Sequence, residues 1–150
     1  MLENITNRQY PYPEVPETIR RKFAAQQVMD LFNARLASIN PGKVEIEMEF
    51  QAALSHQDGF LHAGVVTTLL DSACGFAALS LMPAGSQVLS VEFKVNLLAP
   101  AKGQRFLARG EVVKSGRTLT VCHGELLSFQ DNTPTIAAIM QATMMCINVN

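Results

Sequence analysis

Asp71 is the one charged side chain in residues 63–82 of this sequence. The stretch is too long and too rich in Ala, Gly and Ser for a typical strand, so it predicts a helix, and a helix that is apolar on nearly every side is normally buried. An unpaired carboxylate is costly inside such a helix. Asp71 is therefore expected to have a polar partner or to mark a functional site, although a structural bond to a neighbouring loop would also explain it.

The start of this predicted helix could bind a developing negative charge. His62, Ala63 and Gly64 follow a loop over residues 55–61. The first turn of any helix has free backbone N–H groups and the positive end of the helix dipole. Because Ala63 and Gly64 carry no bulky side chain, a carbonyl oxygen could reach those N–H groups, as in an oxyanion hole. The alternative is that the small residues only permit close packing.

The distance between these two features limits how they could work together. His62 lies nine positions before Asp71. This spacing corresponds to about 13 Å along a helix axis and about two and a half turns, so the two residues lie on opposite sides. Either the two features are unrelated, or they meet across a subunit interface. A two-fold dimer would create two equivalent composite sites.

The composition excludes several classes of protein. The chain has 150 residues, which suits a single domain over 1–150, and 48% of them are hydrophobic. A formal net charge of −1 leaves no electrostatic footprint for nucleic acid. The predicted helix is long enough to span a membrane, but Asp71 near its middle and the absence of a following Lys/Arg cluster argue against a membrane span.

Cysteine usage and the N-terminal sequence predict a cytoplasmic protein. The number of cysteines is odd, at three, and Cys74 lies in the predicted buried helix, which indicates free thiols in a reducing compartment. A buried thiol is inert, so Cys74 is predicted to be a core residue. No Cys or His spacing resembles a metal site, and the N-terminus lacks the basic and apolar regions of a secretory signal.

Hydrophobic periodicity predicts the remaining elements. Residues 1–15 predict an irregular arm, and residues 16–39 predict one amphipathic helix that could break near Ala24. Strands are predicted at 43–54, 87–99, 104–114, 118–129 and 135–149. The predicted core face of the second strand consists of Leu89, Val91, Phe93, Val95 and Leu97, with Ser90 on the opposite face. Short turns imply antiparallel neighbours, so the chain is predicted to be an α+β fold in which the sheet wraps around the long helix.

This order of elements, together with three sequence motifs, resembles the hotdog-fold acyl-CoA thioesterases, in particular the phenylacetate-pathway (PaaI-like) branch. The motifs are DGFLHAGVVTTLLDSACGFAA, VEFKVNLLAPAKG and VVKSGRTL, and the resemblance covers residues 23–147. It implies an antiparallel hotdog sheet around a central helix, with an additional N-terminal helix. It also implies hydrolysis of an aromatic or short- to medium-chain aliphatic acyl-CoA, with no metal and no cofactor beyond the coenzyme A of the substrate.

The resemblance further implies a homodimer with composite active sites, which we expect to pair into a homotetramer, and it assigns roles to individual residues. Asp71 matches the catalytic carboxylate, acting as general base on water or as nucleophile on the thioester carbonyl. The backbone N–H of Ala63, with Gly64 beside it, matches the oxyanion site offered by the partner subunit. His62 matches the motif histidine that helps to shape this turn, and Ser90 matches a strand hydroxyl that helps to place the water.

The sequence departs from the family pattern six positions before the motif histidine, where many members carry Asn or Gln. His56 occupies this position and Gln57 follows it, and either side chain could donate a hydrogen bond to the carbonyl or the water. Phe60 is a candidate for the substrate pocket. Lys114 and Arg117, which flank Gly116, could bind the coenzyme A phosphates, or they could be solvated hairpin charges.

Two other functions are open at this stage. A hotdog hydratase or dehydratase usually pairs a His with an acid in one site, and no such signature is present. A non-catalytic acyl-CoA binding module or sensor would have no need of Asp71 or of an open helix start. His123 and Glu125 share the face of a predicted strand, where a surface or interface role is expected for the histidine.

Overall fold

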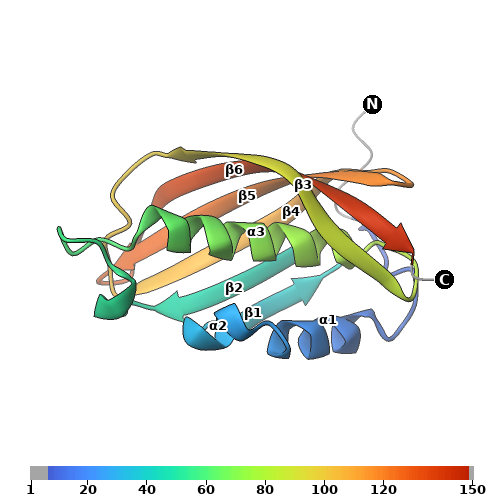
Figure 1. Ribbon diagram of the computed structural model, residues 1–150, viewed down its shortest axis with the longest axis horizontal. Coiled ribbons are helices and arrows are strands. Elements are labelled where there is room, and N and C mark those ends of the chain that lie inside the picture. Colours follow the sequence, from blue (N-terminus) through green and yellow to red (C-terminus); the bar gives the residue numbers. More distant parts are fainter. Residues whose placement is uncertain (1–6, 149–150) are drawn as a thin grey trace.

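Helix α3 lies along the inner side of a curved antiparallel sheet (Figure 1). The computed structural model describes residues 7–148. The sheet has six strands in the order β1-β2-β4-β5-β6-β3, so that β1 and β3 are its two edges. The strands are β1 (Arg35–Asn40), β2 (Lys43–Glu49), β3 (Ser86–Leu97), β4 (Arg105–Ser115), β5 (Leu119–Gln130) and β6 (Thr133–Asn148).

The helix predicted around Asp71 is α3 (Ala63–Leu79), and most of its residues are buried. It lies close to the sheet because β4 has no side chain at Gly110. A Cβ atom at this position would lie 2.3 Å from the carbonyl carbon and oxygen of Ala73, which is closer than atoms can pack. The backbone of β4 therefore contacts the backbone of α3 directly, and this contact sets the distance of Asp71 from the sheet.

The single N-terminal helix predicted over 16–39 is wrong beyond its first half. The structure has α1 (Val15–Ala24), a break at the position expected, the short helix α2 (Gln27–Leu31), and then the strand β1. Asn33 has a φ of 48°, a left-handed conformation that ends the helical segment. Of the predicted arm, residues 1–6 lie outside the described residues, and residues 8–14 form no helix or strand.

A β-bulge explains why β1 has a helix-like sequence pattern. Leu36 pairs with Ile46 and Ile39 pairs with Val44, although the register shifts between these two pairs. Since the extra residue restores the side-chain direction, Leu36 and Ile39 both point to the core at a spacing of three. The same spacing in a regular strand would place them on opposite faces.

The core face predicted for strand β3 is wrong at the start of the strand, because β3 contains a second bulge. Leu89 pairs with Met145 on the outer face, whereas Ser90 pairs with the buried Met144 and points toward α3. The register shifts between Ser90 and Glu92, so the inner face then continues through odd-numbered residues. Because β3 is an edge strand, much of its apolar surface is exposed in the single chain; the residues concerned are Leu89, Val91, Phe93 and Leu97.

Candidate active site

The Asp71 carboxylate has a hydrogen-bond partner from another element of the fold. The Ser90 hydroxyl donates to Asp71 Oδ1 over 2.6 Å and thereby joins α3 to β3. This bond depends on the bulge in β3, since strict alternation would point Ser90 away from the helix. Within residues 7–148, the second carboxylate oxygen of Asp71 makes no hydrogen bond, so it is free to accept a proton.

A cleft of about 110 Å³ opens beside this pair. Its lining consists of Gln26, Asp71, Ser72, Gly75, Phe76, Val88 and Ser90. Asp71 is half-buried, and it is the only ionisable side chain among these lining residues. The cleft is larger than the roughly 10–15 Å³ that a single water requires. It can therefore bring a water and part of a larger molecule to the carboxylate.

The start of α3 forms a second, separate polar feature. His62 is the N-cap residue, and its Nδ1 accepts a hydrogen bond from the backbone N–H of Gly64 over 2.9 Å. The N–H of Gly64 is therefore already engaged, and His62 holds the first turn in shape. The backbone N–H of Ala63 makes no hydrogen bond within residues 7–148. Of the two expected oxyanion donors, Ala63 is the one that remains free.

Ala63 borders a pocket of about 330 Å³ that is mainly apolar. His56 and Phe60 line this pocket, with their rings in edge-on contact at 5.4 Å between centroids. His56 Nδ1 accepts a hydrogen bond from the backbone N–H of Asp58, so in the neutral ring the proton resides on Nε2. Gln57 is exposed and outside the pocket lining, where its amide contacts Asp58.

The cleft at Asp71 and the pocket at Ala63 have no lining residue in common. Ala63 precedes Asp71 by eight positions on α3, which corresponds to about 12 Å along the helix. On β3, Ser90 borders the cleft and Leu97 borders the pocket, which corresponds to about 23 Å along a strand. Within one chain, the expected carboxylate and the expected oxyanion donor therefore lie far apart, one in the cleft and the other in the pocket.

The hairpin between β4 and β5 holds the three residues predicted to contact coenzyme A. The turn is tight, because a Cβ atom at Gly116 would lie 2.6 Å from the Leu119 carbonyl oxygen. Lys114 and Arg117 are exposed, and neither forms an ion pair within residues 7–148. Cross-strand pairing runs from Ser115 through β5 and β6 to Ser90, so the hairpin lies at the Asp71 end of the sheet.

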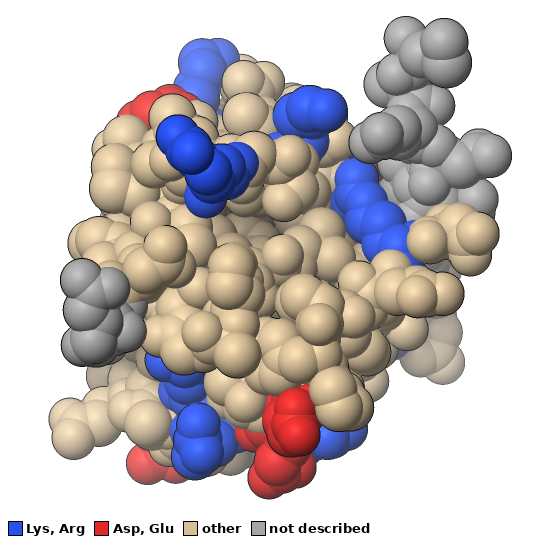
Figure 2. Space-filling view, turned by 90° about the vertical axis from the view of Figure 1, so that its right-hand side faces the viewer, with Lys and Arg blue, Asp and Glu red and all other residues tan. Residues whose placement is uncertain are grey.

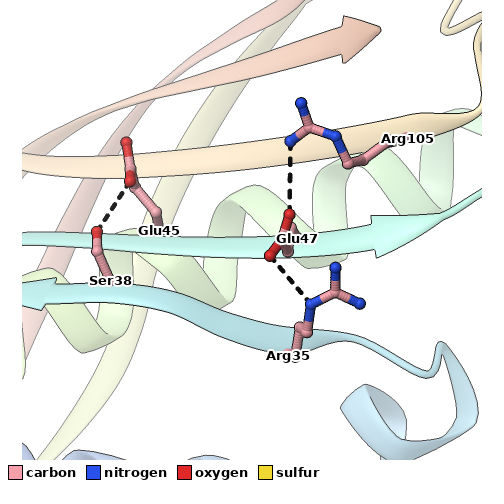
Figure 3. Close-up of polar contacts among 5 residues, drawn as sticks. All are labelled: Arg35, Ser38, Glu45, Glu47 and Arg105. Carbon is pink, nitrogen blue, oxygen red and sulfur yellow. Dashed lines mark hydrogen bonds and ion pairs between the residues drawn. The ribbon is translucent and has the colours of Figure 1, made fainter. Parts of the chain in front are cut away.

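A second group of charged residues lies on the outer face of the sheet (Figure 3). Glu47 bridges Arg35 at 3.0 Å and Arg105 at 3.4 Å, which joins β1, β2 and β4. Glu45 accepts hydrogen bonds from Ser38 at 2.8 Å and from Arg109 at 2.7 Å. Burial raises the pKa of Glu45, but the hydrogen bonds from Arg109 and Ser38 and the positive charges of Arg109 and Lys43 together outweigh it, so the pKa lies below its ordinary value. We call Arg35, Ser38, Glu45, Glu47, Arg105 and Arg109 the outer ladder.

The remaining reactive side chains lie away from the cleft or are shielded. Burial raises the pKa of the Cys74 thiol well above its ordinary value and that of Cys122 to about 12, so both are core residues, as predicted for Cys74. His123 is at the surface, 3.4 Å from Glu125.

Residues 7–148 contain no group of three or more His, Cys, Asp or Glu side chains that could hold a metal ion. In the same range, no helix combines the length and apolar character needed to cross a membrane.

The Lys and Arg side chains on one face of the molecule lie in several separate groups, with uncharged surface between them (Figure 2). This face of the described residues therefore has no continuous basic surface.

Residues 58–135 match the family model of the thioesterase superfamily, and this range contains the start of α3, Asp71 and Ser90. The chain belongs to the thioesterase superfamily. The predicted hotdog fold and the classification of the chain as a thioester hydrolase are thereby confirmed. The superfamily assignment does not by itself identify the acyl group or the roles of individual side chains.

Solved structures of thioesterases have the same fold. A thioesterase family protein from Silicibacter pomeroyi is 50% identical, with a TM-score of 0.89, and the match covers 90% of this chain and 99% of that one. The PaaI protein of the phenylacetic acid degradation operon from E. coli has a TM-score of 0.80 over 90% of this chain and 94% of its own. Its identity is 15%, so this likeness supports the fold alone.

Among curated proteins, human acyl-coenzyme A thioesterase 13 is 34% identical over 85 residues. The match covers 56% of this chain and 60% of the human protein, so it spans less than two thirds of that relative. This match agrees with the superfamily assignment, because the relative is itself named as a thioesterase.

One lining residue of the Asp71 cleft, Gln26, was not anticipated from the sequence. A continuous helix over 16–39 gives no reason to single out a glutamine. Gln26 instead occupies the break between α1 and α2, where it is the N-cap residue of α2. The expected break near Ala24 was the only signal that this segment could turn toward α3.

Proposed function

We propose that this thioesterase hydrolyses acyl-CoA, with Asp71 of one subunit and the start of α3 of its partner forming each active site. The observation that carries the proposal is the 2.6 Å hydrogen bond from Ser90 to Asp71, which holds one carboxylate oxygen and leaves the other free in the cleft. The human relative named as an acyl-coenzyme A thioesterase supports the choice of thioester.

Strand β3 is the proposed dimer contact. It is an edge strand with exposed apolar residues, which makes it a ready template for pairing with a second chain. If two copies of β3 pair antiparallel about a two-fold axis, opposite ends of the strand meet. The Leu97 end, beside the Ala63 pocket, would then approach the Ser90 end of the partner, beside its Asp71 cleft. Each dimer would contain two complete sites, and pairing of two dimers into a tetramer is part of the same proposal.

The proposed reaction uses both halves of such a site. The thioester carbonyl oxygen accepts a hydrogen bond from the backbone N–H of Ala63, at the positive end of α3. Asp71 takes a proton from water while the water oxygen forms a bond to the carbonyl carbon. The C–S bond of the tetrahedral intermediate then breaks, and the leaving thiolate takes the proton from Asp71. No metal or organic cofactor takes part in this proposal.

The remaining predicted residues have subsidiary roles in the proposal. His56 donates from Nε2 to the carbonyl oxygen or the water, because it lines the pocket and Gln57 does not. Phe60 and the apolar lining around it contact the acyl group. Lys114 and Arg117 bind the phosphates of coenzyme A, and the tight turn at Gly116 presents them.

The experiment for this proposal measures thiol release from a panel of aromatic and aliphatic acyl-CoAs. We expect turnover of at least one member, with the preferred chain length and shape set by the pocket at Phe60. Tight binding of acyl-CoA without release of thiol would contradict hydrolysis and favour a binding module. A covalent acyl group on Asp71, found in protein quenched with acid during turnover, would show that Asp71 acts as a nucleophile and not as a general base.

A further inference from the structure

Gln26 lines the same cleft as Asp71, although it comes from a different part of the chain. Its backbone is fixed on both sides, because its N–H donates to the Phe23 carbonyl at 3.0 Å and its carbonyl accepts from Met29 N–H at 3.0 Å. Met29 is buried, and Phe23 packs against Phe76 of α3 with ring centroids 6.0 Å apart. The break between α1 and α2 is thus anchored against α3, and it forms one wall of the cleft.

The side chain of Gln26 is oriented by Ser72, the residue that follows Asp71. Ser72 donates its hydroxyl hydrogen to Gln26 Oε1 over 3.2 Å. Other hydroxyls of α3 act differently: Thr67 and Thr68 donate to carbonyls four positions earlier in the same helix, which is the usual arrangement. Ser72 instead reaches a residue 46 positions away. This bond leaves the two N–H donors of the Gln26 amide without a hydrogen bond inside residues 7–148.

Gln26 and Asp71 are therefore held in the same way on neighbouring walls of one cleft. Ser90 holds one oxygen of the Asp71 carboxylate, and Ser72 holds the oxygen of the Gln26 amide. The second carboxylate oxygen of Asp71 and the Nε2 of Gln26 are both left for a molecule in the cleft, and the two atoms are complementary. The carboxylate accepts a hydrogen bond and the amide donates one.

We propose that Gln26 binds the attacking water, donating from Nε2 to the water oxygen while Asp71 accepts a proton from the same water. One lone pair of the water is then held by Gln26, and the other is directed at the thioester carbonyl carbon. The proton passes to Asp71, as in the proposed hydrolysis, and Gln26 remains neutral throughout. This inference rests on the proposed function, since it assigns a further residue to that reaction.

The deciding substitution is Gln26→Glu, which keeps the size of the side chain and the oxygen that accepts from Ser72. It replaces the amide donor by an acceptor and adds a negative charge beside Asp71. We expect kcat to fall about tenfold or more while KM changes by less than about threefold, because the water and not the acyl-CoA loses its partner. The acidic limb of the pH–rate profile should move to higher pH, because a nearby like charge disfavours ionisation of a carboxyl group.

Gln27→Glu is the matched control, since the next residue is exposed and lies outside the cleft lining, and it makes the same change of charge. It should leave kcat, KM and the pH–rate profile as in the wild type. Gln26→Leu is the second variant, which removes the donor without adding charge, and it should lower kcat with no shift in the pH–rate profile. Circular dichroism and thermal unfolding would check that each variant folds.

Wild-type kcat and an unchanged pH–rate profile in Gln26→Glu, or wild-type kcat in Gln26→Leu, would overturn the role of Gln26 and leave it as an anchor for Ser72. Asp71→Asn, assayed alongside, separates this result from failure of the proposed function. If the wild type is active, Asp71→Asn is inactive and the Gln26 variants are fully active, only the present inference falls. If the wild type hydrolyses no acyl-CoA, both fall together.

Discussion

Carboxylates occur in two different settings on the two sides of the sheet. In the outer ladder, Glu45 and Glu47 each contact arginine side chains, and Glu45 also accepts from Ser38. On the inner side, Asp71 has a serine hydroxyl as its hydrogen-bond partner and an open cleft beside it. An arginine stabilises the charged form of a carboxylate through its positive charge as well as its hydrogen bonds, whereas a hydroxyl supplies a hydrogen bond alone. We therefore expect the outer carboxylates to stabilise the fold and Asp71 to be available for proton transfer.

The largest difference between the two settings should appear when a carboxylate is replaced by its amide. Asp71→Asn should lower kcat for acyl-CoA hydrolysis by about a hundredfold or more, as expected for loss of a general base. Glu47→Gln makes the same chemical change in the outer ladder and should leave kcat unchanged. Equal activity of Asp71→Asn and the wild type in a thiol-release assay would assign Asp71 a structural role.

A smaller difference is expected for the serine that accompanies each carboxylate. Ser90→Ala should lower kcat by about tenfold, because Asp71 keeps its carboxyl group but loses the bond that orients Oδ1. Ser38→Ala removes a similar serine–carboxylate bond, of 2.8 Å, from Glu45 and serves as the matched control. If both variants keep wild-type kcat and KM, Ser90 and Ser38 would not differ in the way expected for Asp71 and the outer carboxylates.

The smallest effect concerns stability and its dependence on pH. The pKa of Glu45 is lowered in the folded state, so its contribution to stability is present above the ordinary value of 4.5 and is lost as the pH falls through the folded value. Because Glu45 is partly exposed, Glu45→Gln should cost only about 0.2–1 kcal/mol of unfolding free energy at pH 7. Urea unfolding should show that this cost disappears below the folded pKa. A cost that grows on acidification would have the opposite sign and contradict the assignment.

The central helix and the hairpins could be predicted from the sequence because their patterns are local. The apolar stretch around Asp71 is helical by length and composition, and the β4–β5 hairpin follows from alternation around a turn at Gly116. Both errors arose at bulges. The bulge in β1 places Leu36 and Ile39 on one face at a helix-like spacing, and the bulge in β3 turns Ser90 inward. A single extra residue in a strand leaves no clear mark in a hydrophobicity pattern.

The candidate site could be predicted only in part for a related reason. Asp71 stands out because a charge is rare inside an apolar helix, and its nine-residue spacing from His62 places it about 13 Å from the helix start. The family resemblance gives Ser90 a role, whereas alternation alone places it on the wrong face. Gln26 depends on a contact between residues 46 positions apart, so no local pattern could indicate it.

The most direct test asks whether Asp71 and the Ala63 donor of one active site belong to different subunits. Ala63 is the first residue of α3 and His62 before it is extended, so Ala63→Pro removes the proposed donor at a position where helices accept proline. Ala63→Pro and Asp71→Asn should each be nearly inactive in acyl-CoA hydrolysis. Coexpressed with different affinity tags, the two variants should recover about one quarter of wild-type activity, because half of randomly assorted dimers are hybrids with one intact site of two. A hybrid dimer, purified through both tags, that is no more active than its parents would contradict the composite site.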